Sequence, residues 1–298
     1  MSLALLANLK RVGAVKMLGV IGGSGLYELD GLKIEAEHDV ETPFGKPSSM
    51  ILQGVYEGQN ILFLARHGFG HQFLPHEVNY RANIFALKKL GARRIFGVSA
   101  SGSLREELKP GDLALVSQYF DHTRGRRAQT FFGGGIVGHV SMAYPACMAL
   151  SDDIVLAAAR LNQELHVDKT YGCVEGPRLG TRAESFFLRD SAKCDLVGMT
   201  NVPEAFLARE AQMAYATVCL VTDYDCWMDD PDQHVSVEKF FEVYGAAMEK
   251  AKALLGELLK APFSETPSDI RESLKASVLT PDEAFTAEQK EWMGVLRA

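Results

Sequence analysis

The sequence lacks the features that would place it in several common classes of protein. No apolar run reaches the roughly 18–20 residues that span a bilayer. The Leu/Ala stretch at the N-terminus is followed, not preceded, by basic residues and has no small-residue cleavage site, so no signal peptide is predicted and we expect a cytoplasmic protein. The formal net charge of −7 disfavours nucleic acid or an anionic membrane surface as the main partner. A small anion stays compatible with this charge, because its site needs only one local arginine and a few N–H groups.

Cysteine is scarce, and metal-ligand spacing is absent. The five cysteines are odd in number and form no CxxC pair, which disfavours both a zinc site and a disulfide framework. His71 and His76 lie close together, but their loop offers no carboxylate or cysteine at ligand spacing. We therefore expect no bound metal.

A dinucleotide-binding fingerprint is missing as well. The segment 19–25 (GVIGGSG) makes a glycine-rich turn after an apolar run, but it does not read GxGxxG, and no acidic strand end about 20 residues later stands out. An NAD site is therefore disfavoured. The turn is either purely structural or binds an anion through its N–H groups and the Ser24 hydroxyl.

The sequence does contain short apolar runs that alternate with amphipathic stretches, which is typical of an α/β domain with a central sheet. The segment 95–118 reads as two strands joined by a turn at 109–112, so we expect a mixed sheet flanked by helices. The expected strands are 17–21, 61–65, 94–98, 113–118, 195–199 and 216–222, and the expected helices are 76–90, 151–164, 182–192 and 203–212.

The last fifth of the chain begins with a long helix and ends in a tail of different composition. An apolar stripe at helical spacing predicts a helix over 236–260, and 261–268 reads as a linker. Capping boxes at Thr181 and Thr280 predict helix starts in the domain and in the tail. We expect one domain over residues 1–260 and a helical extension over 261–298.

Four turns with small or hydroxyl residues follow the expected strands. They carry Ser24, Arg66, Ser99 and Thr200. Ligands of open α/β sheets bind at the carboxyl ends of the strands, and an arginine fork or a helix N-terminus attracts anions. The four turns together predict a phosphate site, with a surface salt bridge as the alternative role for Arg66.

Two aspartates end the buried run 216–222. Asp223 and Asp225 are two residues apart, so in extended backbone they point to the same side and Tyr224 to the other. A desolvated carboxyl has a raised pKa and can donate a proton. The pair could form hydrogen bonds to one ring nitrogen and one amino group, as on the N7/N6 edge of adenine. The alternative is that both aspartates lie in a solvated loop.

Nine short motifs stand in order along the chain: GVIGGSGL (19–26), TPFGKP (42–47), RHG (66–68), VNYRAN (78–83), GSLREE (102–107), EGPR (175–178), TRAES (181–185), MTNVPE (199–204) and TDYDCW (222–227). They resemble the purine nucleoside phosphorylase family, and especially its members that act on 5'-methylthioadenosine. The similarity covers about residues 17–260, in order and with similar spacing. It implies the fold of that family and a pentosyltransferase that uses phosphate to cleave 5'-methylthioadenosine to adenine and 5-methylthioribose 1-phosphate, in purine and methionine salvage, without metal or organic cofactor.

The resemblance also implies roles for individual residues. Asp223 would donate a proton to N7 of the purine and Asp225 would accept from the 6-amino group, which makes both catalytic and base-recognising. One histidine would come from a neighbouring subunit of a homotrimer, with a hexamer as the alternative. The implied positions are Ser24, Arg66, His67, Ser99, Ala100 and Thr200 for phosphate, Met199 for ribose, Tyr224, Leu179 and Gly180 for the base, Val237 for the 5' pocket, and His71 and His139 (the latter from the neighbour) near the site.

Some residues depart from the family pattern. Ser24 replaces threonine, Leu179 replaces an aromatic residue, Gly180 is smaller than usual, and the loop 131–138 is rich in glycine. Three alternatives stay open: a phosphorylase for adenosine, inosine or 5'-methylthioinosine, a nucleoside-binding protein without activity, and an NAD-dependent oxidoreductase.

Overall fold

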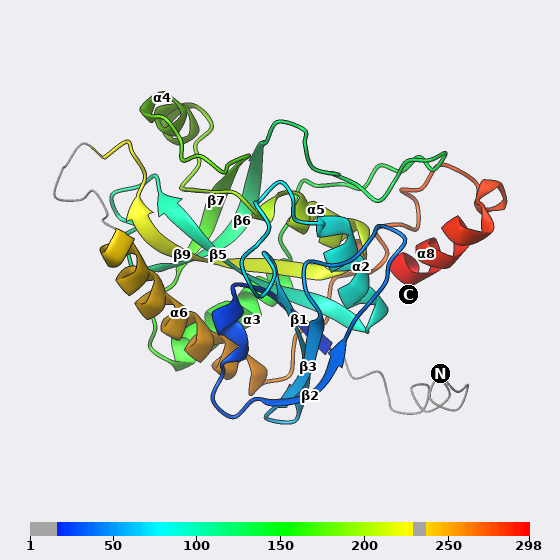
Figure 1. Cartoon of the computed structure of the whole chain (residues 1–298), viewed down its shortest axis with the longest axis horizontal. Helices are drawn as coiled ribbons and strands as arrows, with labels where there is room; N and C mark the ends of the chain where they lie inside the picture. Colours follow the sequence, from blue (N-terminus) through cyan, green and yellow to red (C-terminus); the bar gives the residue numbers. More distant parts are fainter. Residues whose placement is uncertain (1–16, 229–236) are drawn as a thin grey trace.

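The computed structural model describes residues 17–228 and 237–298, without the side chains of Ser24, Tyr27 and residues 237–240. Nine strands form one sheet, with helices packed on both faces (Figure 1). The strands are β1 (Met17–Gly22), β2 (Lys33–His38), β3 (Ile51–Tyr56), β4 (Gln59–Ala65), β5 (Ala92–Ser103), β6 (Leu113–His122), β7 (His166–Val174), β8 (Leu196–Gly198) and β9 (Ala214–Tyr224).

The helices follow the order expected from the apolar periodicity. They are α2 (Tyr80–Lys89), α3 (Met148–Arg160), α4 (Arg182–Phe186), α5 (Asn201–Glu210), α6 (Val237–Leu259), α7 (Ser268–Arg271) and α8 (Ala287–Arg297), with short turns η1 (Ser24–Tyr27), η2 (Phe187–Ser191) and η4 (Asp282–Ala284). None of the helices in the described segments is long and apolar enough to cross a membrane.

The sheet is mixed, as the sequence predicted. β1, β4 and β5 run parallel to one another, whereas β2, β3 and β4 form an antiparallel meander. The strand order is β2-β3-β4-β1-β5-β8-β7-β6-β9, and β5 also pairs with β9. Because β5 also pairs with β9, the five strands β5, β8, β7, β6 and β9 form a closed barrel. Strands β1 to β4 extend from it as an open sheet.

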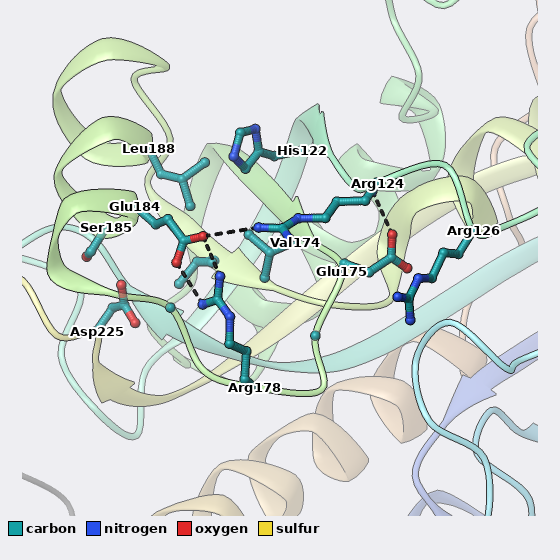
Figure 2. Close-up of a pocket in the computed structure, with 13 residues that line it drawn as sticks. His122, Arg124, Arg126, Val174, Glu175, Arg178, Glu184, Ser185, Leu188 and Asp225 are labelled. Carbon is teal, nitrogen blue, oxygen red and sulfur yellow. Dashed lines mark hydrogen bonds and ion pairs between the residues drawn. The ribbon is translucent and has the colours of Figure 1, made fainter.

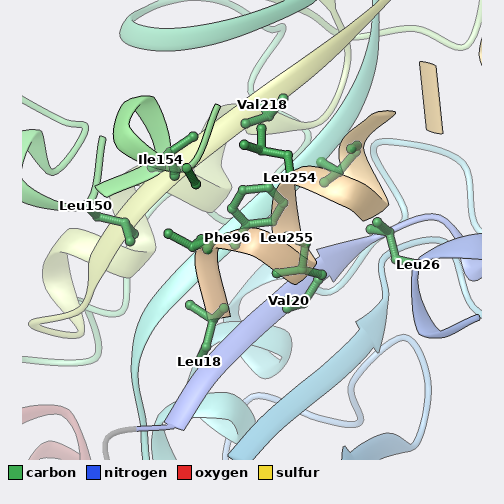
Figure 3. Close-up of a cluster of buried hydrophobic side chains, with 14 of the residues drawn as sticks. Leu18, Val20, Leu26, Phe96, Leu150, Ile154, Val218, Leu254 and Leu255 are labelled. Atoms are coloured by element: carbon green, nitrogen blue, oxygen red, sulfur yellow. The ribbon is translucent and has the colours of Figure 1, made fainter. Parts of the chain in front are cut away.

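Most of the core lies in two apolar layers because successive strand residues face opposite sides of the sheet, and two smaller buried clusters lie among β5 to β9 and beside α4 and η2. In β4, Ile61 and Phe63 join the layer under α3 and α6, while Leu62 and Leu64 join the layer under α2, α5 and α8. Figure 3 shows the first layer, where Phe96 of β5 lies among residues of α3 and α6. Complete burial of a side chain of this size contributes about 1.5–3 kcal/mol.

The tail packs against the α2 side of the domain (Figure 1). Trp292 of α8 is buried and its ring lies 5.6 Å from that of Phe44. Before the tail, Arg94 of β5 donates to the carbonyl of Ser264 at 2.6 Å, which fixes the linker. The tail thus shares the domain's apolar layer.

One of the two predicted capping boxes is present and the other is wrong. Thr181 and Glu184 exchange the side-chain to backbone bonds of a capping box at the start of α4. Thr280 caps no helix: its hydroxyl accepts from the N–H of Val137 and donates to the carbonyl of Gly135, so it binds the loop before α3. The capping box of the tail starts instead at Thr286, at α8.

Candidate active site

Two of the predicted anion-binding turns, those after β1 and β4, meet Ser99 at one edge of the sheet. The turn predicted at 99–103 is wrong, because this segment continues strand β5 to Ser103. β1 pairs in parallel with β4 and β5, so the carboxyl ends of all three strands lie side by side. The N–H of Arg66 donates to the carbonyl of Gly22 at 3.0 Å, which ties the first two turns together. The backbone of Ser24 lies in η1 at this edge, and its side chain is outside the described part of the chain.

Arg66 is buried and paired with Glu204 of α5, which lies 138 positions away in the sequence. Two nitrogens of Arg66 contact the two carboxylate oxygens at 2.7 and 2.8 Å, and the exposures of the two residues are 2% and 0%. Burial alone would lower the pKa of Arg66, but the charge of Glu204 outweighs it and the pKa rises. A hydrogen bond from the Tyr215 hydroxyl to Glu204, at 2.8 Å, completes this buried cluster.

The remaining contacts of Arg66 limit how it can bind phosphate. Besides Glu204 it donates to the carbonyl of Val98 at 2.8 Å and to that of Ile21 at 3.4 Å. A guanidinium has five N–H groups, so one stays available on Nη1. The alternative of a surface salt bridge is wrong, because the ion pair with Glu204 is buried. The remaining N–H leaves Arg66 able to donate to an anion as well.

His67 and His71 lie together beside Arg66. Their rings stack with centroids 4.6 Å apart, and His67 Nδ1 lies 2.8 Å from the carbonyl of Phe73. Burial, with the nearby charges of Arg66 and His71, lowers the pKa of His67 to about 4. At neutral pH the ring is uncharged, and since Nδ1 carries the proton for Phe73, Nε2 is a hydrogen-bond acceptor.

Ser99 and Thr200 form the next part of this edge. Their hydroxyl oxygens are 3.1 Å apart although the residues come from β5 and from the turn before α5, and both are buried. Ala100 follows Ser99 and is exposed. Met199 packs on Gly176 so closely that a Cβ on that glycine would lie 2.4 Å from the methionine sulfur.

The two aspartates flank Gly102 of β5, which is in register with Asp223 of β9. A Cβ on Gly102 would lie 3.4 Å both from Asp223 Oδ2 and from Asp225 Cβ. Tyr224 turns away, and its hydroxyl donates to the carbonyl of Glu106 at 3.0 Å. The two carboxyl residues therefore lie on one side of the strand end and the tyrosine on the other, as predicted from their spacing.

Asp223 has the electrostatics of a proton donor. Burial raises its pKa, the neighbouring charge of Asp225 raises it further, and a hydrogen bond of 2.6 Å from the Thr222 hydroxyl opposes the shift. A carboxyl with a raised pKa holds its proton at a higher pH than an exposed one.

A cavity of about 110 Å³ opens beside Asp225 (Figure 2). Gly180 lines it, whereas Leu179 next to it is 80% exposed and does not cover it. Arg178 holds Glu184 through two bonds of 2.8 and 2.6 Å on this wall. The other lining residues include several that sequence reasoning missed: His122, Arg124, Arg126, Glu175, Ser185 and Leu188.

Two predicted residues stand apart from the rest. His139 makes no hydrogen bond or ring contact with the other predicted site residues described in this chain, and its N–H donates to the carbonyl of Ser277 in the tail at 2.8 Å. Val237 begins α6, and its side chain lies outside the described residues. No group of three or more His, Cys, Asp or Glu side chains within the described ranges is arranged to hold a metal ion.

Glu204 and Arg127 are the main residues that sequence reasoning missed. Glu204 closes the MTNVPE motif, in which the sequence predicts roles only for Met199 and Thr200. Arg127 sits in a run of three arginines within four positions and gave no signal of its own, yet it is buried next to Glu175.

Known proteins share this fold and much of this sequence. The model of the phosphorylase superfamily matches residues 17–260. The S-methyl-5'-thioadenosine phosphorylase of Geobacter sulfurreducens is 44% identical over 281 residues, which cover 94% of this chain and 98% of that protein. That of Hyperthermus butylicus is 48% identical over 242 residues, covering 81% and 87%.

Solved structures agree with these relatives. A methylthioadenosine phosphorylase from an antarctic soil metagenomic library has a TM-score of 0.88 and 41% identity, covering 95% of this chain and 99% of that one. A mutant of the adenosine/methylthioadenosine phosphorylase of Schistosoma mansoni, in complex with adenine, has a TM-score of 0.82 and 34% identity, covering 89% and 99%. The predicted fold and family are confirmed, and the chain belongs to the phosphorylase superfamily.

Proposed function

We propose that the protein is a pentosyltransferase that cleaves 5'-methylthioadenosine with phosphate to give adenine and 5-methylthioribose 1-phosphate. The observation that carries the proposal is the juxtaposition of two kinds of group at one sheet edge. Ser99 and Gly102 belong to β5, and Asp223 is in register with Gly102 on β9. Hydroxyl groups suited to phosphate and a carboxyl suited to a purine therefore lie on neighbouring strands. The relatives named above carry this activity in their names.

At the phosphate end, the proposed ligands are the hydroxyls of Ser99 and Thr200, the free N–H of Arg66 and the backbone of η1 near Ser24. His67 would accept a hydrogen bond from a phosphate hydroxyl through Nε2. Ala100 would contribute backbone only. Fixing phosphate below the sugar replaces a bimolecular attack on the anomeric carbon by a positioned one, an advantage that reaches about 7–11 kcal/mol in well-oriented systems.

At the base end, Asp223 would give its proton to N7 as the N-glycosidic bond breaks and negative charge develops on the purine. General acid catalysis of this kind typically contributes about 10²–10⁴-fold. Asp225 would accept from the 6-amino group, and a 6-oxopurine would leave this acceptor unpaired. Met199 would lie under the ribose, with Leu179, Gly180 and Tyr224 around the base and His71 nearby.

We also propose that the working form is a homotrimer, with a hexamer as the alternative. Support comes from His139, which lies apart from its own chain's site on a loop bound to the tail. In an oligomer this loop would complete a neighbour's site, and Val237 would shape the 5' pocket. The reaction as written needs phosphate as co-substrate and no metal or organic cofactor, and we place it in cytoplasmic purine and methionine salvage.

Adenosine is the second candidate substrate, because the Schistosoma mansoni protein carries both substrates in its name. The test is adenine release from 5'-methylthioadenosine and adenosine, and release of hypoxanthine from 5'-methylthioinosine, with and without phosphate. We expect release to need phosphate and to be fastest with 5'-methylthioadenosine. Phosphate-independent release would mean hydrolysis, and faster turnover of the 6-oxopurine would show that the aspartate pair does not read adenine.

A further inference from the structure

Arg127 is a buried residue with every N–H group of its side chain committed. It lies between β6 and α3 and is 5% exposed. Nη1 donates to the carbonyls of Met199 and Val202, each at 2.6 Å. Nη2 donates to those of Glu175 at 3.0 Å and Val174 at 3.3 Å, and Nε to the Glu175 carboxylate at 3.2 Å. A guanidinium has five donors, so none is left over.

The four carbonyls belong to two segments that line the proposed site. Met199 and Val202 lie on either side of Thr200, whose hydroxyl contacts Ser99. Val174 and Glu175 line the cavity beside Asp225 and lead into Gly176, on which Met199 packs. Arg127 therefore joins the two segments behind the place where the ribose and the phosphate would meet.

The Glu175 carboxylate extends this network toward the cavity. Its second oxygen accepts from the N–H of Arg124 at 2.6 Å, so the turn that carries Arg124 is fixed by the same group (Figure 2). Burial raises the pKa of Glu175, but the bonds from Arg124 and Arg127 outweigh it and the pKa falls. The carboxylate therefore stays ionised and balances the charge of Arg127.

We infer that Arg127 is a positioning residue for the phosphorolysis proposed above, on which this inference rests. It sets the place of the Met199 carbonyl and of the Thr200 turn and touches no substrate itself. Lysine cannot replace it. An ammonium group has three donors and lacks the planar geometry of a guanidinium, whereas four carbonyls and a carboxylate oxygen accept hydrogen bonds here. With lysine at position 127, the Thr200 turn loses its fixed position and phosphate is no longer held in line for attack.

The experiment compares Arg127→Lys with Arg94→Lys, a matched change at another buried arginine. Arg94 is 2% exposed, donates to the carbonyl of Ser264 and lies over the Phe263 ring, away from the proposed site residues. Both variants lose a buried guanidinium, so both should have a lower Tm than wild type. We expect Arg127→Lys alone to lower kcat by about 10²-fold and to raise the KM for phosphate, since small displacements of reacting groups have effects of this size.

A binding measurement separates this inference from the proposed function. Phosphate that binds the folded state raises its Tm, and Arg127→Lys should lose this increment while Arg94→Lys keeps it. Adenine release by wild type tests the proposed function on its own. The role of Arg127 would be overturned if the two variants had the same kcat, the same KM for phosphate and the same rise in Tm with phosphate. It would also be overturned if phosphate did not raise the Tm of wild type.

If Arg127→Lys does not fold, Glu175→Gln tests the same network more gently. The glutamine amide keeps one acceptor oxygen, which can still bind Arg127 Nε. It removes the negative charge and the second acceptor oxygen, so Arg127 and the Arg124 N–H no longer both have a carboxylate partner. We expect kcat to fall severalfold with a modest change in Tm. An unchanged kcat and an unchanged KM for phosphate in this variant would overturn the inference.

Discussion

The two ends of the candidate site are built in opposite ways. At the phosphate end the charges of Arg66 and Glu204 are buried and satisfy each other, at 2% and 0% exposure. At the base end Asp223 and Asp225 are only half-buried, and Leu179 is 80% exposed beside an open cavity. The first end is fixed by long-range packing before any ligand arrives, whereas the second consists of side chains free to contact one.

The phosphate end therefore contributes mainly to the stability of the fold, and the base end mainly to recognition of the substrate. A change at the phosphate end disturbs a buried ion pair and is expected to act on folding, because breaking such a pair leaves an unpaired charge in the interior. A change at the base end acts on protonation and on hydrogen bonds to the purine, with little effect on the fold. The experiments below test this division.

The largest expected effect is on catalysis, from Asp223→Asn. The amide keeps the shape of the carboxyl but cannot transfer a proton, so kcat for 5'-methylthioadenosine should fall by about 10²–10⁴-fold. The free energy of unfolding should change little. Steady-state assays and urea titrations measure both, with Asp190→Asn on the exposed part of η2 as the control. A loss below tenfold would remove Asp223 as the general acid.

The next effect is on stability, from Glu204→Gln. The substitution leaves Arg66 as a buried cation without a counter-charge, which should cost about 3–5 kcal/mol of unfolding free energy. The matched control is Asp282→Asn, which breaks the exposed pair with Arg297 and should change the unfolding free energy far less, because solvent screens that pair. Urea denaturation decides the matter. Similar losses in the two variants would show that the phosphate end is not the rigid one.

A pH experiment should show a smaller effect from His67. Its pKa is lowered to about 4 in the folded state, against about 6.5 when unfolded, so between these values the unfolded state binds more protons. The contribution to stability is therefore complete above pH 6.5 and is lost as the pH falls toward 4. Because the ring is partly exposed, the loss is on the order of 1–2 kcal/mol.

Urea titrations of wild type and His67→Gln at pH 7 and pH 5 measure this contribution. The variant lacks the titrating ring, so its stability should fall less on acidification than that of wild type. Parallel losses in the two proteins would mean that His67 titrates normally and that its ring is not held neutral by burial.

The smallest effect is expected at the exposed side of the base end, from Leu179→Phe. Leu179 is largely exposed and Gly180 beside it has no atom within 4 Å of an added Cβ, so space exists for an aromatic ring over the purine. Stacking contributes about 0.5–1.5 kcal/mol, so the KM for the nucleoside should fall up to about tenfold. The KM for phosphate should not change. A parallel change in both constants would contradict the separation of the two ends.

Local pattern in the sequence predicted most of the sheet but missed three strands. β2 (Lys33–His38) is mostly exposed at the sheet edge, and only the second half of β7 (His166–Val174) is buried. β3 (Ile51–Tyr56) was missed too, although it pairs directly with the predicted β4. Strands with exposed residues, such as β2 and β7, read as polar segments when no partner is known. This reason does not apply to β3, which is mostly apolar and has no exposed residue.

The site shows the same limit. The spacing of Asp223 and Asp225 determined which side they face, because alternation is a local property of a strand. The pairing of Arg66 with Glu204 joins residues 138 positions apart, and no local pattern announces such a contact. The hydroxyl of Thr280 likewise accepts from the N–H of Val137 in a distant loop and does not cap a helix in the tail.

The pairing of β5 with β9 has a consequence for how such an enzyme could change its substrates. Ser99 lies three residues before Gly102, the position in register with Asp223, which corresponds to about 10 Å along a strand. This spacing belongs to the backbone, so no rotamer change or point substitution can lengthen it. Mutation can alter which base or which 5' group is accepted, whereas a glycoside with a longer unit between base and phosphate would require the two strands to shift register.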